Sequence, residues 1–247
     1  MIVKEFGTKN RDILIFLHGG GLSWWNYTGE IQSLEKEYHI IVPILDGHSQ
    51  SDRPFASIED NASELINFID QNCNGSVKFI GGLSLGGQIL LEMLSQRNSI
   101  CGCAMIESAL AYPLKTTHKL IAPSLRLSYG LIRQRWFSKL QFQSLHIRNS
   151  LFEDYYKDTC GITKSDYISI LQANTNYTLK SPLSDCKAKT LVLVGSRERP
   201  IMKQSARAIQ ELIPNSTLET LKGYHHGELS INHADAYVDR VRELLEP

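Results

Sequence analysis

The chain has 247 residues, of which 42% are hydrophobic and 21% are charged, and its formal net charge is zero. This length is enough to bury a full core, and the balanced charge gives no argument for a nucleic-acid partner. No apolar run approaches the roughly 18 residues of a membrane span, and the first residues lack the build of a signal peptide. Five scattered cysteines are typical of free thiols, so we expect a cytoplasmic protein.

Strands and helices are predicted to alternate along most of the chain. Short apolar runs predict strands, and apolar residues at helical spacing predict helices. The expected strands cover residues 13–17, 39–45, 77–81, 100–106, 190–195 and 217–221, and the expected helices cover residues 31–38, 57–69, 85–94, 202–213 and 237–245. This alternation predicts an α/β fold with a mostly parallel central sheet and helices on both faces.

A strand, a sharp turn and a helix are predicted around Ser84, within Gly82-Leu83-Ser84-Leu85-Gly86. A strand that reverses into a helix over one residue forces that residue into a strained conformation. The glycines at 82 and 86 remove the Cβ atoms that would collide at such a turn. Ser84 would then expose its hydroxyl at the tip, beside the unpaired N–H of Leu85 at the start of the helix.

The loops after the other predicted strands carry further polar residues. In a parallel sheet the functional loops lie at the carboxyl ends of the strands. These loops contain residues 18–21, residues 46–52, Glu107, Glu198 and His226. We expect these residues to converge on Ser84 at one edge of the sheet.

Three motifs resemble those of the α/β-hydrolase superfamily. They are His18-Gly19-Gly20-Gly21, the G-x-S-x-G pattern around Ser84, and Gly223-Tyr224-His225-His226-Gly227, with a further likeness in Gly47-His48-Ser49-Gln50-Ser51-Asp52. The resemblance covers most of the chain outside residues 113–184. It implies a triad in the chain order serine, acid, histidine, with Ser84 as nucleophile, Glu198 as acid and His226 as base. It also implies an oxyanion hole from the N–H groups of Gly20 and Leu85, without a cofactor or a metal.

For two members of this triad, the acid and the base, the sequence offers an alternative residue. The superfamily usually has an aspartate near position 198, whereas this chain has Glu198 between two arginines, which are expected to favour its ionised form or to hold it in a surface ion pair. Glu107, at the end of the preceding strand, is the alternative acid, and His225 is the alternative base to His226. A metal site would use His225, His226, Glu228 and His233, and it is disfavoured because no second group of ligands supports it.

Residues 113–184 stand where the superfamily carries a helical cap, which leaves residues 1–112 and 185–247 as the core. Caps cover the site and contact the substrate, so the fold alone says little about specificity. The apolar residues of this segment predict helices over an apolar pocket. The expected substrate contacts are Gly21, Trp24, Trp25 and Trp136.

One stretch of the chain is purely basic. No Asp or Glu occurs between Ser108 and Phe152, which span Lys115, Lys119, Arg126, Arg133, Arg135, Lys139 and Arg148. This pattern is typical of a solvated face balanced by acids elsewhere, of attraction for an anionic substrate, or of docking on an acidic surface. The second hypothesis predicts turnover that falls steeply with salt.

The sequence therefore predicts a carboxylesterase-like serine hydrolase that cleaves a small ester or related acyl compound through a covalent acyl-enzyme. One alternative is a hydrolase of C–C bonds or thioesters, or a lyase, on the same triad. Another is a non-catalytic ligand-binding protein of this fold, which the unusual Glu198 favours. The expected partner is a small acyl molecule, and the oligomeric state stays open.

Overall fold

The computed structural model describes residues 1–246, and it confirms the mostly parallel α/β sheet. Seven strands stand in the order β1-β3-β2-β4-β5-β6-β7. Their bounds are β1 Val3–Phe6, β2 Ile13–Leu17, β3 His39–Pro43, β4 Val77–Leu83, β5 Cys101–Glu107, β6 Lys189–Gly195 and β7 Ser216–Leu221. The sequence predicts all of these except β1, which pairs antiparallel with β3 at the sheet edge. β1 is too short and too little buried to give a recognisable pattern.

The central position of β4 explains its composition. It pairs in parallel with β2 on one side and with β5 on the other. Ile80 lies opposite Ile15 and Ala104, and all three side chains are buried. Near-continuous apolar runs of this kind are typical of parallel strands that are covered on both faces. Ser84 follows directly after this strand, so its position is fixed by the buried centre of the sheet.

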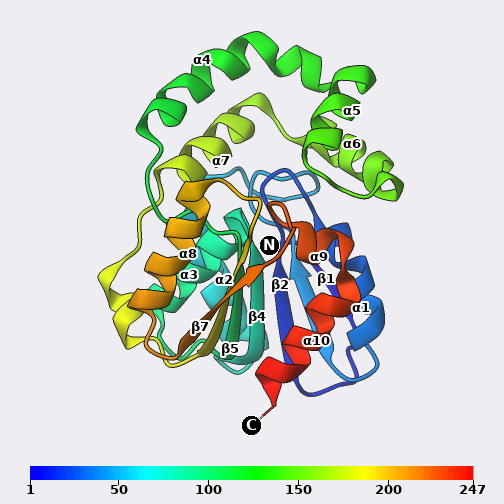
Figure 1. Cartoon of the computed structure of the whole chain (residues 1–247). Helices are drawn as coiled ribbons and strands as arrows, with labels where there is room; N and C mark the ends of the chain where they lie inside the picture. Colours follow the sequence, from blue (N-terminus) through cyan, green and yellow to red (C-terminus); the bar gives the residue numbers. More distant parts are fainter. Residues whose placement is uncertain (247) are drawn as a thin grey trace.

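Helices cover both faces of the sheet (Figure 1). One face packs against α2 Ile58–Asn72, α3 Leu85–Gln96 and α8 Pro200–Leu212, and the other packs against α1 Thr28–Leu34 and α10 Ala234–Leu245. The short helices η1 Trp24–Tyr27 and α9 Glu228–Asn232 follow β2 and β7. α1 ends earlier than predicted and is followed by a turn, in which the Leu34 carbonyl accepts hydrogen bonds from the N–H groups of Glu37 and Tyr38.

The chain between β5 and β6 forms helices that lie beyond the carboxyl ends of the strands (Figure 1). Their bounds are α4 Lys115–Ile132, α5 Arg135–Ser144, η2 Asn149–Leu151, α6 Phe152–Gly161, α7 Lys164–Asn176 and η3 Ser181–Asp185. α4 packs along α7, and α5 packs against α6. Across residues 1–246, no helix has the length and hydropathy that crossing a bilayer requires.

Candidate active site

Ser84 makes the turn from β4 into α3 with a backbone φ of 53° and ψ of −109°. A positive φ of this kind costs a residue with a Cβ about 1–3 kcal/mol. The N–H of Ser84 donates a hydrogen bond of 2.8 Å to the Glu107 carbonyl, which fixes the turn to β5. A Cβ on Gly82 would lie only 2.5 Å from the carbonyl oxygen of Gly86. The predicted sharp turn is therefore present, and glycine is required where the chain passes close to itself.

Gly86 packs its backbone against the end of β2, where an added Cβ would collide with the Leu17 carbonyl. We expect Gly86→Ala to lower the free energy of unfolding by about 3 kcal/mol, because the clash is between two backbones. Urea unfolding followed by circular dichroism measures this loss. Gly130→Ala is the control, since nothing lies within 4 Å of a Cβ added there in α4, and it is expected to stabilise by about 0.5–1 kcal/mol. Equal losses in both variants would contradict the argument.

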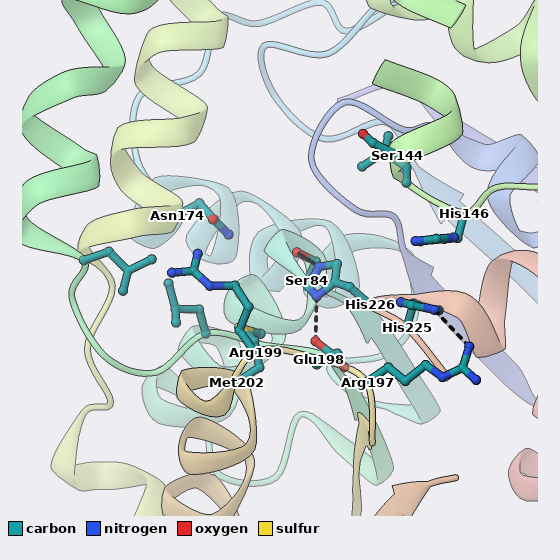
Figure 2. A pocket seen from close by; sticks show the side chains of 13 residues that line it. Ser84, Ser144, His146, Asn174, Arg197, Glu198, Arg199, Met202, His225 and His226 are labelled. Carbon is teal, nitrogen blue, oxygen red and sulfur yellow. Dashed lines mark hydrogen bonds and ion pairs between the residues drawn. The ribbon is translucent and has the colours of Figure 1, made fainter. Parts of the chain in front are cut away.

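A chain of hydrogen bonds joins three of the predicted residues (Figure 2). His226 Nε2 lies 3.0 Å from Ser84 Oγ, and His226 Nδ1 lies 2.8 Å from Glu198 Oε2. Ser84 follows β4, Glu198 follows β6 and His226 follows β7, so three separate loops bring them together. The His226 side chain is 47% exposed, whereas that of Glu198 is 1% exposed. The serine and the imidazole thus face solvent, and the carboxylate lies behind them.

Glu198 is held as a carboxylate. Its Oε1 accepts hydrogen bonds of 2.8 Å from the N–H of Gly195 and from the hydroxyl of Ser108. Burial alone would raise the pKa of Glu198. The hydrogen bond and charge of His226, the N–H of Gly195 and the hydroxyl of Ser108 together outweigh this effect and hold the pKa below its usual value. The flanking arginines were expected to do this, yet the partners of both carboxylate oxygens come from elsewhere.

Ser108 is a residue of the site that the sequence analysis did not single out. Its hydroxyl donates to Glu198 and accepts a hydrogen bond of 3.3 Å from the N–H of Gly227, the residue after His226. The Ser108 side chain thus connects Glu198 to the loop that carries His226. The only signal in the sequence is its position directly after β5, next to Glu107.

Glu107, the alternative acid, has a different environment. Its Oε1 accepts hydrogen bonds from the N–H groups of Leu229 at 3.1 Å and Ser230 at 3.4 Å, at the start of α9. Burial raises the pKa of Glu107 to about 7. The partner of the His226 ring at Nδ1 is Glu198, so Glu107 serves to hold α9.

His225, the alternative base, points away from Ser84. Its ring stacks on that of His146 with centroids 3.9 Å apart, and its Nε2 lies 3.4 Å from a guanidinium nitrogen of Arg197. Its backbone N–H donates a hydrogen bond of 2.7 Å to Glu228. The structure therefore brings His226, and not His225, to the serine.

Leu85 and Gly20, the residues expected to supply the two N–H donors, are neighbours. Leu85 is the first residue of α3, and the first N–H groups of a helix have no partner within it. A Cβ built on Gly20 would lie 3.7 Å from the Leu85 side chain. Gly21 is different, because its N–H already donates a hydrogen bond of 3.1 Å to His48 Nε2. This N–H therefore serves to hold the loop.

Two buried histidines support this glycine loop, a role that the sequence analysis did not assign. His18 Nδ1 lies 3.0 Å from the Gly19 carbonyl, and His18 Nε2 accepts a hydrogen bond from the N–H of Leu45. The rings of His18 and His48 meet edge to face at 4.8 Å. Burial lowers the pKa of His48 to about 4 and that of His18 well below its usual value. Both rings are therefore neutral at physiological pH, and they support the loop by hydrogen bonding and packing.

Ser84 stands between two cavities. The larger, of about 390 Å³, is lined by Ser84, Leu110, Leu114, Ser144, Leu145, His146, Asn174, Arg197, Glu198, Arg199, Met202, His225 and His226. The smaller, of about 130 Å³, is lined by Gly19, Gly20, Leu22, Leu83, Ser84, Leu145, Ile147, His226, Gly227 and Ile231. The larger one combines apolar side chains with two arginines and with other polar groups, and the smaller one is mostly apolar. A molecule reacting at Ser84 therefore meets two unlike environments.

The aromatic residues expected to contact substrate line neither cavity. Trp25 is buried, and its indole N–H donates a hydrogen bond of 2.8 Å to Asp158. Trp24 packs against Phe6 with ring centroids 6.0 Å apart. Trp136 is 61% exposed on α5. Gly21 is also absent from both linings, because its backbone serves the contact with His48.

The basic stretch also lies elsewhere. Its seven basic residues are all exposed on the helical segment and line neither cavity. Arg135 pairs with Glu153, an acid just beyond the stretch. Its charges are therefore not the ones that a molecule beside Ser84 would meet.

Among residues 1–246, no three His, Cys, Asp or Glu side chains are grouped as a metal ion requires.

Residues 12–227 match the family described as the alpha/beta hydrolase fold. The uncharacterised hydrolase YugF of Bacillus subtilis is 24% identical over 88% of this chain and 84% of its own length, and Lipase 1 of Psychrobacter immobilis is 20% identical over 92% and 74%. A bromoperoxidase structure from Bacillus anthracis has a TM-score of 0.84 at 16% identity, covering 99% of this chain and 95% of that one. The chain belongs to the alpha/beta hydrolase fold family.

Proposed function

We propose that this chain is a serine hydrolase that cleaves a small carboxylic ester through a covalent acyl-enzyme. The observation that carries the proposal is the unbroken hydrogen-bond chain from Ser84 through His226 to Glu198. A serine hydroxyl is a weak nucleophile until an adjacent base accepts its proton. The strained turn presents Ser84, and the buried carboxylate fixes the imidazole tautomer with its proton on Nδ1.

The reaction follows from these positions. Ser84 Oγ attacks the ester carbonyl carbon while its proton passes to His226 Nε2, and Glu198 stabilises the resulting imidazolium. The oxyanion would accept hydrogen bonds from the N–H groups of Leu85 and Gly20, each worth about 2.7–4 kcal/mol in the transition state. Collapse of this intermediate expels the alcohol, which takes the proton from His226. Water then releases the acid by the same steps.

The cavities support a small substrate. The apolar cavity of about 130 Å³ suits a short hydrocarbon group, and the larger one of about 390 Å³ suits a longer or polar group. Both are lined by Ser84 and His226, so an ester bond between them would lie at the nucleophile. The helical segment contributes Ser144, His146 and Asn174 to the larger cavity, which supports its role as a cap over residues 1–112 and 185–247.

Two further observations favour an esterase over a non-catalytic binder. The Glu198 side chain, longer than the usual aspartate, still places Oε2 at 2.8 Å from His226 Nδ1. The relatives named hydrolase and lipase align over most of this chain. The glutamate that favoured a binding protein in the sequence is thus compatible with catalysis.

A fluorophosphonate probe tests the proposal directly, because it reacts covalently only with an activated serine. We expect one probe per folded molecule, located on Ser84 by peptide mass spectrometry, together with hydrolysis of p-nitrophenyl esters from acetate to octanoate. His226→Ala is the matched control, since it keeps the serine but removes its base, and it should not be labelled. A folded wild-type protein that neither reacts with the probe nor hydrolyses any ester would refute the proposal.

A further inference from the structure

One arginine of the larger cavity forms no ion pair or side-chain hydrogen bond with the described residues, 1–246. Arg199 lies just before α8 and lines the cavity that contains Ser84. Its side chain extends into the cavity on the side of Asn174, whereas that of Arg197 extends toward His225 (Figure 2). The arginines that form ion pairs within residues 1–246 are Arg53, Arg97, Arg135, Arg240 and Arg242. A guanidinium on the wall of a reaction cavity is thus left with its donors uncommitted.

No acid in the cavity neutralises this charge. The only carboxylate among the lining residues is Glu198, and its oxygens accept hydrogen bonds from His226, Gly195 and Ser108. The Glu198 side chain is also only 1% exposed. A cleft lined by one sign of charge attracts the opposite sign, so the larger cavity favours an anion.

Part of the lining that Arg199 shares is apolar. Leu110, Leu114 and Met202 belong to the same lining. A ligand bound at both Ser84 and Arg199 would therefore place methylene groups against these side chains and an anionic group at the guanidinium. Arginine recognises a carboxylate through two parallel hydrogen bonds, which a lysine does not reproduce.

We propose that Arg199 forms an anion subsite, and that the substrates are half-esters of dicarboxylic acids whose free carboxylate binds there. This inference rests on the proposed function, which supplies the ester bond at Ser84. It assigns the anionic preference to Arg199, which lines the larger cavity, and not to the basic residues of the helical segment, which line neither cavity.

A pair of isosteric esters tests this subsite. Mono-p-nitrophenyl glutarate carries the carboxylate, and p-nitrophenyl 5-methylhexanoate replaces it with an isopropyl group of the same shape. We expect the ratio of kcat/KM for the charged ester over the neutral one to fall about 10–100-fold in Arg199→Gln, and to fall with added salt in the wild type. Arg207→Gln is the matched control, because Arg207 is exposed like Arg199 but lies in α8 outside the cavity. Its ratio should stay at the wild-type value.

A binding measurement separates this inference from the proposed function. Monomethyl glutarate is titrated calorimetrically into Ser84→Ala protein, which cannot turn it over, and into the double variant Ser84→Ala/Arg199→Gln. We expect Kd to rise at least tenfold in the double variant. An unchanged Kd or an unchanged specificity ratio overturns the subsite even if neutral esters are hydrolysed. Loss of binding with Arg199→Gln, in a protein that hydrolyses no ester, supports the subsite and rejects the esterase.

Discussion

Ser84→Ala is expected to lower kcat for ester hydrolysis by about 10⁶-fold, as loss of a triad nucleophile does. Without Oγ no acyl-enzyme forms, and His226 has no proton to accept. The alanine keeps the Cβ and the backbone conformation, so the unfolding midpoint should stay close to that of the wild type. Initial rates with p-nitrophenyl butyrate measure the effect, because this ester is short enough for the smaller cavity.

The matched control for this prediction is Ser33→Ala in α1. Its hydroxyl donates to the Gly29 carbonyl, and it lies outside both cavities, so its rate should equal that of the wild type. If Ser84→Ala retains a tenth or more of the activity, another group performs the chemistry and the mechanism is wrong.

Glu198→Gln is expected to lower kcat by about 10⁴-fold, whereas Glu107→Gln should cost less than about tenfold. A glutamine at 198 presents an amide N–H to His226 Nδ1 and stabilises the wrong tautomer. Glu107 instead accepts hydrogen bonds from Leu229 and Ser230, which a glutamine oxygen still does. The same ester assay compares the two variants, and a larger loss at Glu107 would move the acid to the preceding strand.

The free energy of unfolding, measured as a function of pH, tests Glu107→Gln independently of the ester assay. Burial raises the pKa of Glu107 from 4.5 to about 7, so the folded protein binds this proton more tightly than the unfolded chain does. The resulting stability is fully present below about pH 4.5 and is lost as the pH rises through about 7. The wild type should therefore lose free energy of unfolding between pH 5 and 8 relative to the glutamine variant, which has no such proton.

The turn at Ser84 was predictable because its cause is local. A strand, two glycines and a helix lie within one short stretch, and the steric requirement acts between neighbours in the chain. The residues around Glu198 are different, since Ser108 meets it from the end of β5 and His226 meets it from the loop after β7. No periodicity records such contacts, because they depend on how far each loop extends beyond the sheet.

The positions of the tryptophans and of the basic stretch could not be predicted, for another reason. Tryptophan is equally suited to a pocket wall and to a packed core, and the sequence does not say which side of a loop Trp24 and Trp25 face. The indole N–H of Trp25 goes to Asp158, far along the chain. A count of charges has the same weakness. The basic stretch contains more basic residues than the loop after β6, yet α4 packs on α7 and the stretch lies outside the cavity that Arg199 lines.

The position of β7 has a consequence for how activity is lost. This strand pairs only with β6, at the edge of the sheet, and the loop after it carries His226, 142 residues along the chain from Ser84. Edges open at a lower free energy than central strands do, so a local fluctuation there removes the base while the turn after β4 stays intact. We therefore expect ester turnover to be lost before the chain unfolds, so that the rate of turnover reports the native pairing of the last strand.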